Sequence, residues 1–325
     1  MGLSSDMALS GVLLDRATID SGDIDFSDLE SIFPQWDFYD FTARQQVDER
    51  IGDAAVVVSN KVMLDEATLR SAPRLRLVCI AATGTNNVDL DAAQALGVPV
   101  CNVRGYATPA VTQHVFALIL ALTTRLLDYH AGVRAGRWQQ SRQFCLLDHP
   151  IRELEGKTLG VVGYGELGQG VAHIAQAFGM NVLVAQRSGG SPQPHRVPLD
   201  ELLPQVDVLS LHCPLTATTR NLIGAREFAM MRTDAILINT ARGGIVDESA
   251  LADALQEGQI GGAGVDVLTE EPPVNGNPLL ASDIPNLIVT PHSAWASRET
   301  RQRVIDEVAA NIRAFLAGQP RNLVV

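Results

Sequence analysis

The segment spanning residues 158–178 constrains the fold more than any other part of the sequence. An apolar run ends in three glycines, Gly163, Gly165 and Gly168, and a helix-compatible stretch then continues to Phe178. At this spacing the first glycine permits a tight turn, the second lets a phosphate approach the backbone, and the third allows the helix to pack closely on the strand. The helix N-terminus then faces the phosphates. The segment therefore predicts a strand, a turn and a helix that bind a dinucleotide.

Short β-rich runs alternate with helix-compatible stretches in two series, which predicts an α/β fold with two parallel sheets. The runs cover residues 11–15, 54–59, 75–81 and 98–103 in the first series, and residues 158–163, 181–185, 206–212, 235–239, 262–267 and 287–290 in the second. Because 325 residues exceed what one hydrophobic core usually serves, we expect two domains.

Two longer stretches have apolar side chains at helical spacing. Residues 108–127 predict one long helix between the two series, and residues 297–317 predict a closing helix that crosses back to the first domain. The apolar run at residues 115–122 is far shorter than the roughly 20 residues needed to span a membrane, so we expect it in a buried helix.

Charge and cysteine content limit the class of protein. A formal net charge of −12 argues against broad affinity for nucleic acid or anionic membranes, because both need a basic surface. Cys79, Cys101, Cys145 and Cys213 form no CxxC pair, which is typical of core cysteines in a reducing compartment. Residues 1–10 lack a secretory pattern, so a cytoplasmic location is expected, and Met7 is an alternative start that would make residues 1–6 an extension. No metal site is expected.

The end of the strand after the glycine turn bears on the type of dinucleotide. An Asp or Glu usually stands there to bind the ribose hydroxyls, whereas this chain has Gln186, Arg187 and Ser188. Loss of the carboxylate removes repulsion toward a 2′-phosphate, and Arg187 and Ser188 can bind one. We expect NADPH to be favoured over NADH, with a solvated loop arginine as the alternative interpretation of Arg187.

Three residues that follow predicted strands of the second series fit the reduction of a keto acid. Hydride addition to a ketone creates an alkoxide, which needs a proton donor such as His292. A carboxylate beside an imidazole favours its protonated form, the role we assign to Glu271. Arg242 can bind a substrate carboxylate through paired donors. Taken singly, each residue favours an ordinary structural interpretation: Arg242 as a surface cation, Glu271 as part of an acidic loop and His292 as a structural histidine at a strand end.

Five ordered motifs together resemble the D-isomer-specific 2-hydroxyacid dehydrogenase family over nearly the whole chain. They lie at residues 163–168, 211–216, 238–244, 265–272 and 291–297. The resemblance implies that Arg242, Glu271 and His292 are the catalytic set. It also implies a Rossmann-like fold for both domains, with residues 1–106 and 296–325 as a flavodoxin-like substrate-binding domain and residues 107–295 as an inserted NAD(P)-binding domain, and an interdomain cleft that closes over the substrate.

The resemblance extends the expected site beyond the catalytic set and the glycine turn. The loop at residues 82–84 would bind the substrate carboxylate through backbone N–H groups, and Asp266 would approach the nicotinamide amide. Further cofactor contacts are implied at Glu166, Leu167, His212, Cys213, Pro214, Thr219, Thr240, Ala241 and His292, and further substrate contacts at Ala82, Thr83, Gly84, Trp138 and Trp295. A homodimer is also implied, with Trp138 the candidate for a tryptophan contributed across the dimer interface.

Within the family, residues 15–18, residues 102–106 and Trp295 are most similar to glycerate dehydrogenases, also called hydroxypyruvate reductases. This favours hydroxypyruvate and glyoxylate as substrates, and the alternative is another D-2-hydroxy acid. Formate dehydrogenases are disfavoured because they have glutamine in place of Glu271. Phosphoglycerate dehydrogenases often carry an added regulatory domain, which we do not expect here because the sequence stops at Val325. A corepressor-like interaction protein retains the same catalytic residues and stays open as an unfavoured alternative. The remaining histidines, His114, His130, His149, His173, His195 and His212, are interpreted as structural or exposed.

Overall fold

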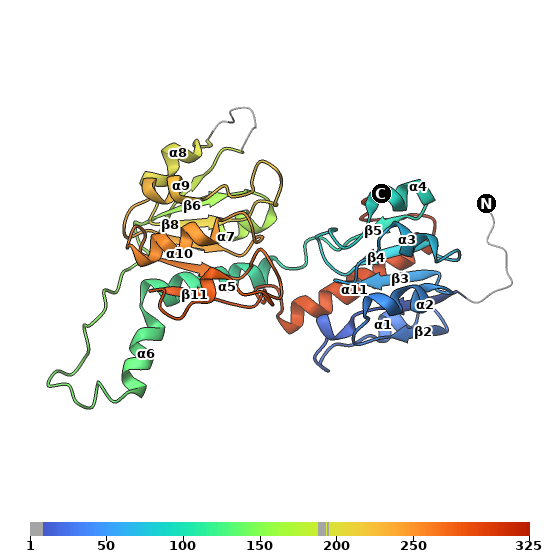
Figure 1. Ribbon diagram of the computed structural model, residues 1–325, viewed down its shortest axis with the longest axis horizontal. Coiled ribbons are helices and arrows are strands. Elements are labelled where there is room, and N and C mark those ends of the chain that lie inside the picture. Colours follow the sequence, from blue (N-terminus) through green and yellow to red (C-terminus); the bar gives the residue numbers. More distant parts are fainter. Residues whose placement is uncertain (1–8, 188–192, 194) are drawn as a thin grey trace. The chain divides into compact units, whose positions relative to one another are not determined.

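The computed structural model describes residues 9–187, 193 and 195–325. The chain divides into two compact units (Figure 1). Unit 1 comprises Met1–Ala107 and Ala296–Val325, and unit 2 comprises Thr108–Trp295. Each unit is built on a parallel sheet with helices, so the expected α/β class with two parallel sheets is confirmed. Residues 1–6, considered above as an extension, and Ser188, an expected cofactor contact, lie outside the described residues.

The sheet of unit 1 has the strand order β2-β1-β3-β4-β5, which is the flavodoxin-like arrangement. Its strands are β1 (Ser10–Leu13), β2 (Gln35–Phe38), β3 (Val56–Ser59), β4 (Leu77–Ile80) and β5 (Val100–Cys101). Strand β3 is buried along its whole length and β2 alternates between exposed and half-buried positions. The sequence analysis missed β2, because a short edge strand with polar outer positions carries little apolar signal. The ring of Trp36 on β2 lies where a side chain on Gly11 of β1 would be, which explains a glycine in that strand.

The helices of unit 1 cover this sheet. They are α1 (Ser27–Glu30), α2 (Val47–Ile51), α3 (Glu66–Arg70), α4 (Leu90–Leu96) and α11 (Arg298–Leu316), with short 3-10 turns at Arg16–Thr18 and Arg44–Gln46. The closing helix α11 packs on α1 and β4. Its length agrees with the expected 297–317, and Ser297 caps its N-terminus by accepting from Thr300 N.

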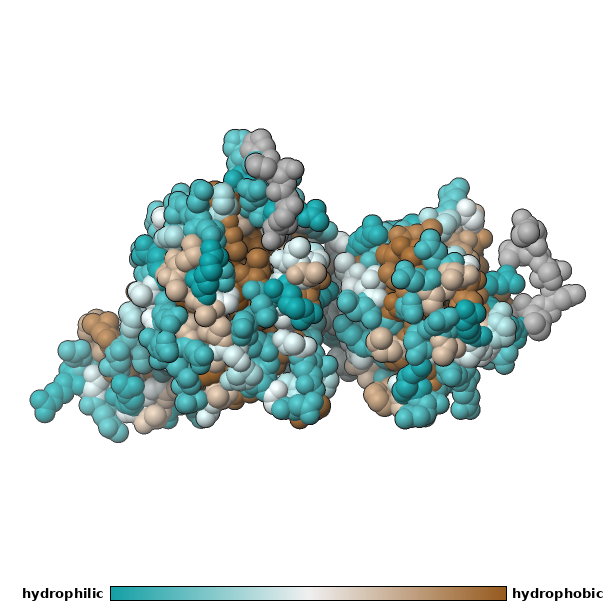
Figure 2. Space-filling view, turned by 45° about the horizontal axis from the view of Figure 1, so that its top comes forward, coloured by the Kyte–Doolittle hydropathy of each residue, from teal (hydrophilic) through white to brown (hydrophobic). Residues whose placement is uncertain are grey.

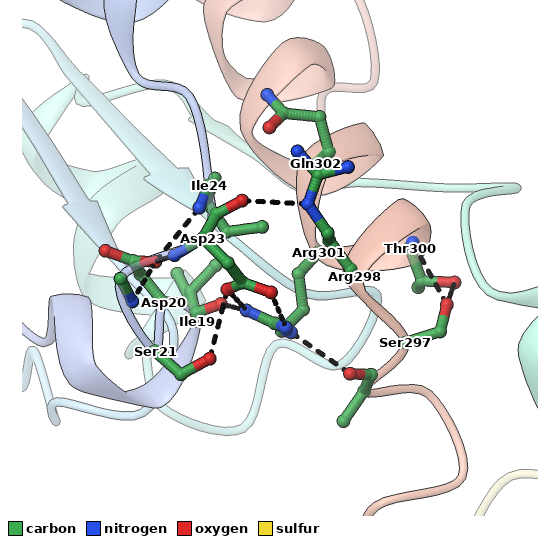
Figure 3. A network of polar contacts seen from close by, with 12 residues as sticks. Ile19, Asp20, Ser21, Asp23, Ile24, Ser297, Arg298, Thr300, Arg301 and Gln302 are labelled. Atoms are coloured by element: carbon green, nitrogen blue, oxygen red, sulfur yellow. Dashed lines mark hydrogen bonds and ion pairs between the residues drawn. The ribbon is translucent and has the colours of Figure 1, made fainter.

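A polar network ties the start of α11 to the segment that follows β1 (Figure 3). The Arg301 guanidinium donates to both carboxylate oxygens of Asp23 at 2.7 and 2.8 Å and to the Ile19 carbonyl at 3.1 Å. Arg298 donates to the Asp23 carbonyl. The bidentate pair holds the pKa of Asp23 well below its ordinary value. The last helix of the chain is thus fastened to the first thirty residues within unit 1.

The described strands of unit 2 form one parallel sheet in the order β11-β10-β9-β8-β6-β7. They are β6 (Thr158–Val162), β7 (Asn181–Val184), β8 (Val208–Leu211), β9 (Ile236–Asn239), β10 (Gly262–Val265) and β11 (Leu287–Val289). Most are shorter than the apolar runs predicted, because the chain leaves the sheet ladder one or two residues before the apolar run ends. A buried core that includes Leu209, Leu237, Leu251 and Phe228 fills the space beside the sheet.

The helices of unit 2 are α5 (Thr108–Thr123), α6 (Leu126–Arg134), α7 (Glu166–Ala177), α8 (Leu199–Leu202), α9 (Ala225–Met230) and α10 (Glu248–Gln256), with 3-10 turns at Leu203–Gln205 and Pro278–Leu280. The prediction of one helix over residues 108–127 was wrong at its end. Arg125 has a φ of 54°, a left-handed conformation that no helix continues through, so α5 stops at Thr123 and α6 starts in a new direction. No single described helix is long and apolar enough to cross a membrane, and α5 with α6 passes that test only as a pair bent by 60°.

Candidate active site

Three neighbouring loops at one edge of the unit 2 sheet carry the expected catalytic residues. Strands β9, β10 and β11 lie side by side and are parallel, so their carboxyl ends meet at the same edge. Arg242 follows β9, Glu271 follows β10 and His292 follows β11. Open parallel sheets bind their ligands at this edge.

Glu271 and His292 form a direct pair. His292 Nδ1 lies 2.6 Å from Glu271 Oε2, and the other carboxylate oxygen, Oε1, accepts from Leu268 N at 2.8 Å. The two side chains are 35% and 29% exposed, so the pair is neither sealed nor freely solvated. Because Nδ1 carries the hydrogen that faces Glu271, the opposite ring nitrogen, Nε2, is left to face a substrate.

The backbone of His292 is strained. Its φ is 53°, in the left-handed region that favours glycine. Its N–H donates to the carbonyl groups of Asp266 and Thr290 at 2.8 and 3.0 Å. The Asp266 side chain is 1% exposed, and its carboxylate accepts from Ser293 N and Ala294 N, each at 2.9 Å. The end of β10 therefore shapes the loop that carries His292.

Arg242 lies on the adjacent loop with contacts of its own. The residue is exposed, and its Nη1 donates to the Ala241 carbonyl at 2.7 Å. The Asn239 side chain closes this turn by donating to the Arg242 carbonyl and accepting from Ala241 N. A Cβ on Gly243 would lie 2.0 Å from the Leu268 carbonyl oxygen, so the Arg242 loop packs tightly on the Glu271 loop. The structure thus pairs Glu271 with His292 directly and places Arg242 on the neighbouring strand end.

The glycine turn has the shape expected of a phosphate-binding turn. Gly163 has a φ of 92°, and a Cβ there would lie 2.5 Å from the His212 and Cys213 backbone. A Cβ on Gly168 would lie 2.1 Å from the Gly163 carbonyl oxygen. Gly165, at the N-terminus of α7, has open space where its side chain would be. Close packing on both sides with free space at the helix N-terminus fits a dinucleotide pyrophosphate.

Two buried polar atoms beside this turn have no hydrogen-bond partner within the described part of the chain. They are His212 Nδ1, after β8, and Thr240 Oγ1, after β9. His212 Nε2 is 2.8 Å from Ser210 Oγ, and burial lowers the pKa of His212 to about 4, so the ring is neutral at pH 7. Burial also raises the pKa of the Cys213 thiol. Orphaned groups at adjacent strand ends are what a bound polar ligand would satisfy.

The side chains of other expected cofactor contacts differ in the hydrogen bonds that they already form within the protein. The Thr219 hydroxyl is used within its own loop, where it donates to the Pro214 carbonyl at 2.6 Å and accepts from Thr216 N. Glu166, in the first turn of α7, accepts from Thr108 Oγ1 at 2.6 Å. Leu167 is half-buried in the same turn.

At the end of β7, Gln186 N donates to the Val197 carbonyl and Arg187 is exposed. The structure adds a residue that the sequence analysis missed. Arg196 donates to the Ala185 carbonyl, and its guanidinium lies 5.8 Å from the ring centre of Tyr164 in the glycine turn. A second arginine therefore stands beside this strand end, and only the fold shows it, because ten residues separate it from Gln186.

Unit 1 carries the expected carboxylate-binding loop at the end of β4. Thr83 Oγ1 donates to the Val103 carbonyl, the Ala82 carbonyl accepts from Val103 N, and the Thr83 carbonyl accepts from Asn102 Nδ2. These contacts hold the loop by its carbonyl and hydroxyl groups, with Gly84 at its end. Of the two expected tryptophans, both in unit 2, Trp138 is 51% exposed with its Nε1 donating to the Phe144 carbonyl, and Trp295 is half-buried.

Comparison with known proteins decides the family. The family model described as D-isomer specific 2-hydroxyacid dehydrogenase, NAD binding domain, matches residues 116–294. The chain belongs to this family. It is therefore an oxidoreductase that uses a nicotinamide cofactor, and the resemblance found in the sequence is confirmed.

Individual relatives span nearly the whole chain. A glycerate dehydrogenase of Methylorubrum extorquens is 46% identical, covering 96% of this chain and 98% of the relative. A hydroxypyruvate reductase of Blautia hydrogenotrophica is 37% identical, covering 96% and 98%. The solved structure of an Aquifex aeolicus D-lactate dehydrogenase complexed with NAD and lactic acid has a TM-score of 0.79 at 29% identity, covering 97% of this chain and 99% of that one.

Proposed function

We propose that this dehydrogenase interconverts hydroxypyruvate with D-glycerate and glyoxylate with glycolate, with Arg242, Glu271 and His292 as its catalytic residues. The observation that carries the proposal is the 2.6 Å contact between His292 Nδ1 and Glu271 Oε2. It fixes the imidazole so that Nε2 faces outward as a proton donor, at the sheet edge where Arg242 also stands.

When bound, the nicotinamide cofactor would supply the hydride that the carbonyl carbon takes up in the direction of reduction. His292 Nε2 gives its proton to the carbonyl oxygen, and the neutral imidazole that remains keeps its Nδ1 hydrogen bond to Glu271. Arg242 binds the substrate carboxylate and polarises the neighbouring carbonyl. In oxidation the same groups act in reverse, with His292 as the base.

The choice of substrate rests on the relatives and on Trp295. Relatives named glycerate dehydrogenase, hydroxypyruvate reductase and glyoxylate reductase share 46%, 37% and 42% identity with this chain, respectively. Trp295, three residues after His292, favours a small substrate side chain by narrowing the space that a substrate beside His292 would occupy. The alternative is a dehydrogenase of another D-2-hydroxy acid.

The choice of cofactor rests on the glycine turn and the strand end after it. Gly163, Gly165 and Gly168 would hold the pyrophosphate, while His212, Cys213 and Thr240 would line the bound dinucleotide, with Asp266 toward the nicotinamide amide. Gln186 in place of a carboxylate, with Arg187 and Arg196 nearby, favours the 2′-phosphate of NADPH.

The test is to measure initial rates of hydroxypyruvate and glyoxylate reduction with NADPH and with NADH, using wild type and His292→Asn. We expect rapid oxidation of NADPH by wild type and a loss of at least a thousandfold in kcat for the variant, because the proton donor is removed. A preference for NADH would overturn the cofactor proposal alone. Absence of turnover with a panel of 2-keto acids, in a chain that still binds NADPH, would favour the corepressor-like alternative.

We also propose a homodimer formed through α6 and the segment after it. This segment exposes large apolar side chains, which are Leu126, Leu127, Val133, Trp138, Phe144, Leu147 and Ile151. Figure 2 shows how hydrophobic residues, in brown, are distributed among hydrophilic ones, in teal, on one face of the molecule. An apolar surface of this kind marks a protein interface. Light scattering should give twice the chain mass, and Phe144→Asp with Leu147→Asp should give the monomer.

Four free cysteines fit a cytoplasmic location.

A further inference from the structure

A polar chain reaches the His292 loop from helix α5. His114, in the second turn of α5, has Nε2 3.0 Å from Thr290 Oγ1 and 3.6 Å from Asp266 Oδ1. Thr290 Oγ1 lies 2.5 Å from the same Asp266 oxygen. The His114 side chain is 21% exposed and that of Asp266 is 1% exposed, so the chain is largely shielded from water.

The hydrogen positions in this chain follow from its contacts. The Thr290 hydroxyl has one hydrogen, which it donates to the Asp266 carboxylate, since a carboxylate can only accept. Thr290 Oγ1 must therefore accept from His114, which fixes a hydrogen on His114 Nε2. The hydrogen bonds run in one direction, from His114 to Thr290 to Asp266.

Asp266 connects this chain of hydrogen bonds to the backbone of the His292 loop. Its carboxylate holds Ser293 N and Ala294 N, and its backbone carbonyl holds His292 N. These contacts surround the residue whose left-handed backbone turns the imidazole toward Glu271. A strained backbone conformation persists only where the surrounding contacts determine it fully. For His292, these surroundings include His114, through Thr290 and Asp266.

We propose that His114 is a positioning residue for His292, acting through Thr290 and Asp266. The proposal rests on the proposed function of His292 as the proton donor. His114 belongs to α5, which packs on β9 and β10, so its ring is held by the body of unit 2 and not by the loop itself. His114 therefore supports the loop after β11 from outside that loop.

Two matched pairs of variants test the role. His114→Leu removes the donor, whereas His114→Gln keeps an N–H near the position of Nε2. Thr290→Val removes the hydroxyl at nearly constant volume, whereas Thr290→Ser retains it. If His114 served only for packing, the members of each pair would behave alike. Should His114→Leu fail to fold, the nearly isosteric Thr290 pair still decides the question.

The first readout needs no turnover: the low-field proton resonance of His292 Nδ1–H, assigned by its loss in His292→Asn and its shift in Glu271→Gln. We expect His114→Leu and Thr290→Val to move or broaden this resonance and to lower kcat about tenfold, with the KM for NADPH changed less than twofold. Gln at 114 and Ser at 290 should restore both.

Wild-type resonance and kcat in both His114→Leu and Thr290→Val would overturn the proposal. The same measurements distinguish failure of the proposed function from failure of the positioning role. If wild type reduces no keto acid while the resonance still moves in the variants, the proposed function fails and the positioning role stands. If wild type is active and the resonance and kcat stay fixed, only the positioning role fails.

Discussion

Each unit has a buried aspartate at the end of an inner strand that binds the loop after a neighbouring strand, and the two aspartates differ in their further contacts. In unit 1, Asp15 follows β1, and its carboxylate accepts from Asn60 N, Lys61 N and Val62 N in the loop after the neighbouring strand β3. In unit 2, Asp266 follows β10 and holds the loop after its neighbour β11 in the same way. Both aspartates are buried, 3% and 1% exposed.

The difference lies in what surrounds each carboxylate. Asp15 is held mainly by backbone N–H groups, and burial raises its pKa despite them. Asp266 also accepts a hydrogen bond from the Thr290 hydroxyl, which in turn contacts His114. The loop that Asp266 holds contains His292, whose backbone is left-handed. A buried aspartate thus orders a loop at the edge of each parallel sheet, and additional side-chain contacts distinguish the loop that carries the proposed proton donor.

The largest expected effect comes from Asp266→Asn. An amide presents an NH₂ group toward N–H donors and leaves some of them unsatisfied, at about 1–3 kcal/mol each. We expect kcat for hydroxypyruvate to fall about a thousandfold, which corresponds to ~4 kcal/mol. Steady-state rates at saturating NADPH measure this, with the Kd for NADPH determined separately by fluorescence. A kcat within threefold of wild type would show that the loop does not depend on this carboxylate.

The second effect is a pH dependence of the free energy of unfolding, and it is confined to unit 2. Because burial lowers the pKa of His212 to about 4 from 6.5, the unfolded chain binds the proton more tightly than the folded one. The stability that the neutral ring provides is fully present above pH 6.5 and is lost as the pH falls toward 4, by about 3 kcal/mol. Urea unfolding of Trp36→Phe, which leaves Trp138 and Trp295 as reporters of unit 2, measures this between pH 7 and 4.5.

His212→Asn in the same background should remove most of that pH dependence, and His173→Asn, on the exposed side of α7, is its control. An unchanged slope in His212→Asn would mean that other groups cause the acid sensitivity of unit 2.

The third effect contrasts with the first. Asp15→Asn should lower the free energy of unfolding of unit 1 by about 2 kcal/mol, because buried N–H donors lose their acceptor. It should leave kcat within about threefold of wild type, because this loop carries no proposed catalytic residue. The fluorescence of Trp36 in a Trp138→Phe, Trp295→Phe background reports the unfolding. If Asp15→Asn lowered kcat as strongly as Asp266→Asn, the distinction between the two loops would be wrong.

The smallest effect is a difference in thiol reactivity. Cys79 and Cys101 of unit 1 are buried on adjacent strands with their sulfurs 3.1 Å apart, and burial raises the pKa of Cys79 well above its ordinary value. Cys145 and Cys213 of unit 2 are half-buried. Aromatic disulfide reagents should therefore label Cys145 first, Cys213 slowly, and Cys79 and Cys101 only after unfolding. Mass spectrometry of digests identifies each site, and early labelling of Cys79 would contradict the structure.

The parts of this fold that the sequence predicted share one property: each depends on local order along the chain. Apolar runs gave ten of the described strands, and the glycine spacing at Gly163, Gly165 and Gly168 gave the turn. Edge strand β2 was missed because its polar outer face hides the period. The break at Arg125 was missed because apolar spacing continues across it while the backbone does not.

The supporting contacts of the site could not be predicted for a different reason. His114 and Thr290 are 176 residues apart in sequence and meet only because α5 packs on the sheet. Arg196 reaches Tyr164 only through the loop after β7. Residues that perform chemistry can be proposed from their type and motif, whereas residues that position them are defined by distances that only the fold supplies.

The last helix and the last residues of the chain both complete unit 1. Helix α11 is fastened to residues 19–31 through Arg301 and Arg313, and the backbone groups of Val324 and Val325 form hydrogen bonds with those of Val100 in β5. The segment of unit 1 up to Ala107 is synthesised before unit 2, yet its sheet lacks this helix and its β5 edge stays open until residues 298–325 have also been made. Unit 2, which is continuous, can fold before then. Unit 1 therefore begins before unit 2 during synthesis and is completed after it.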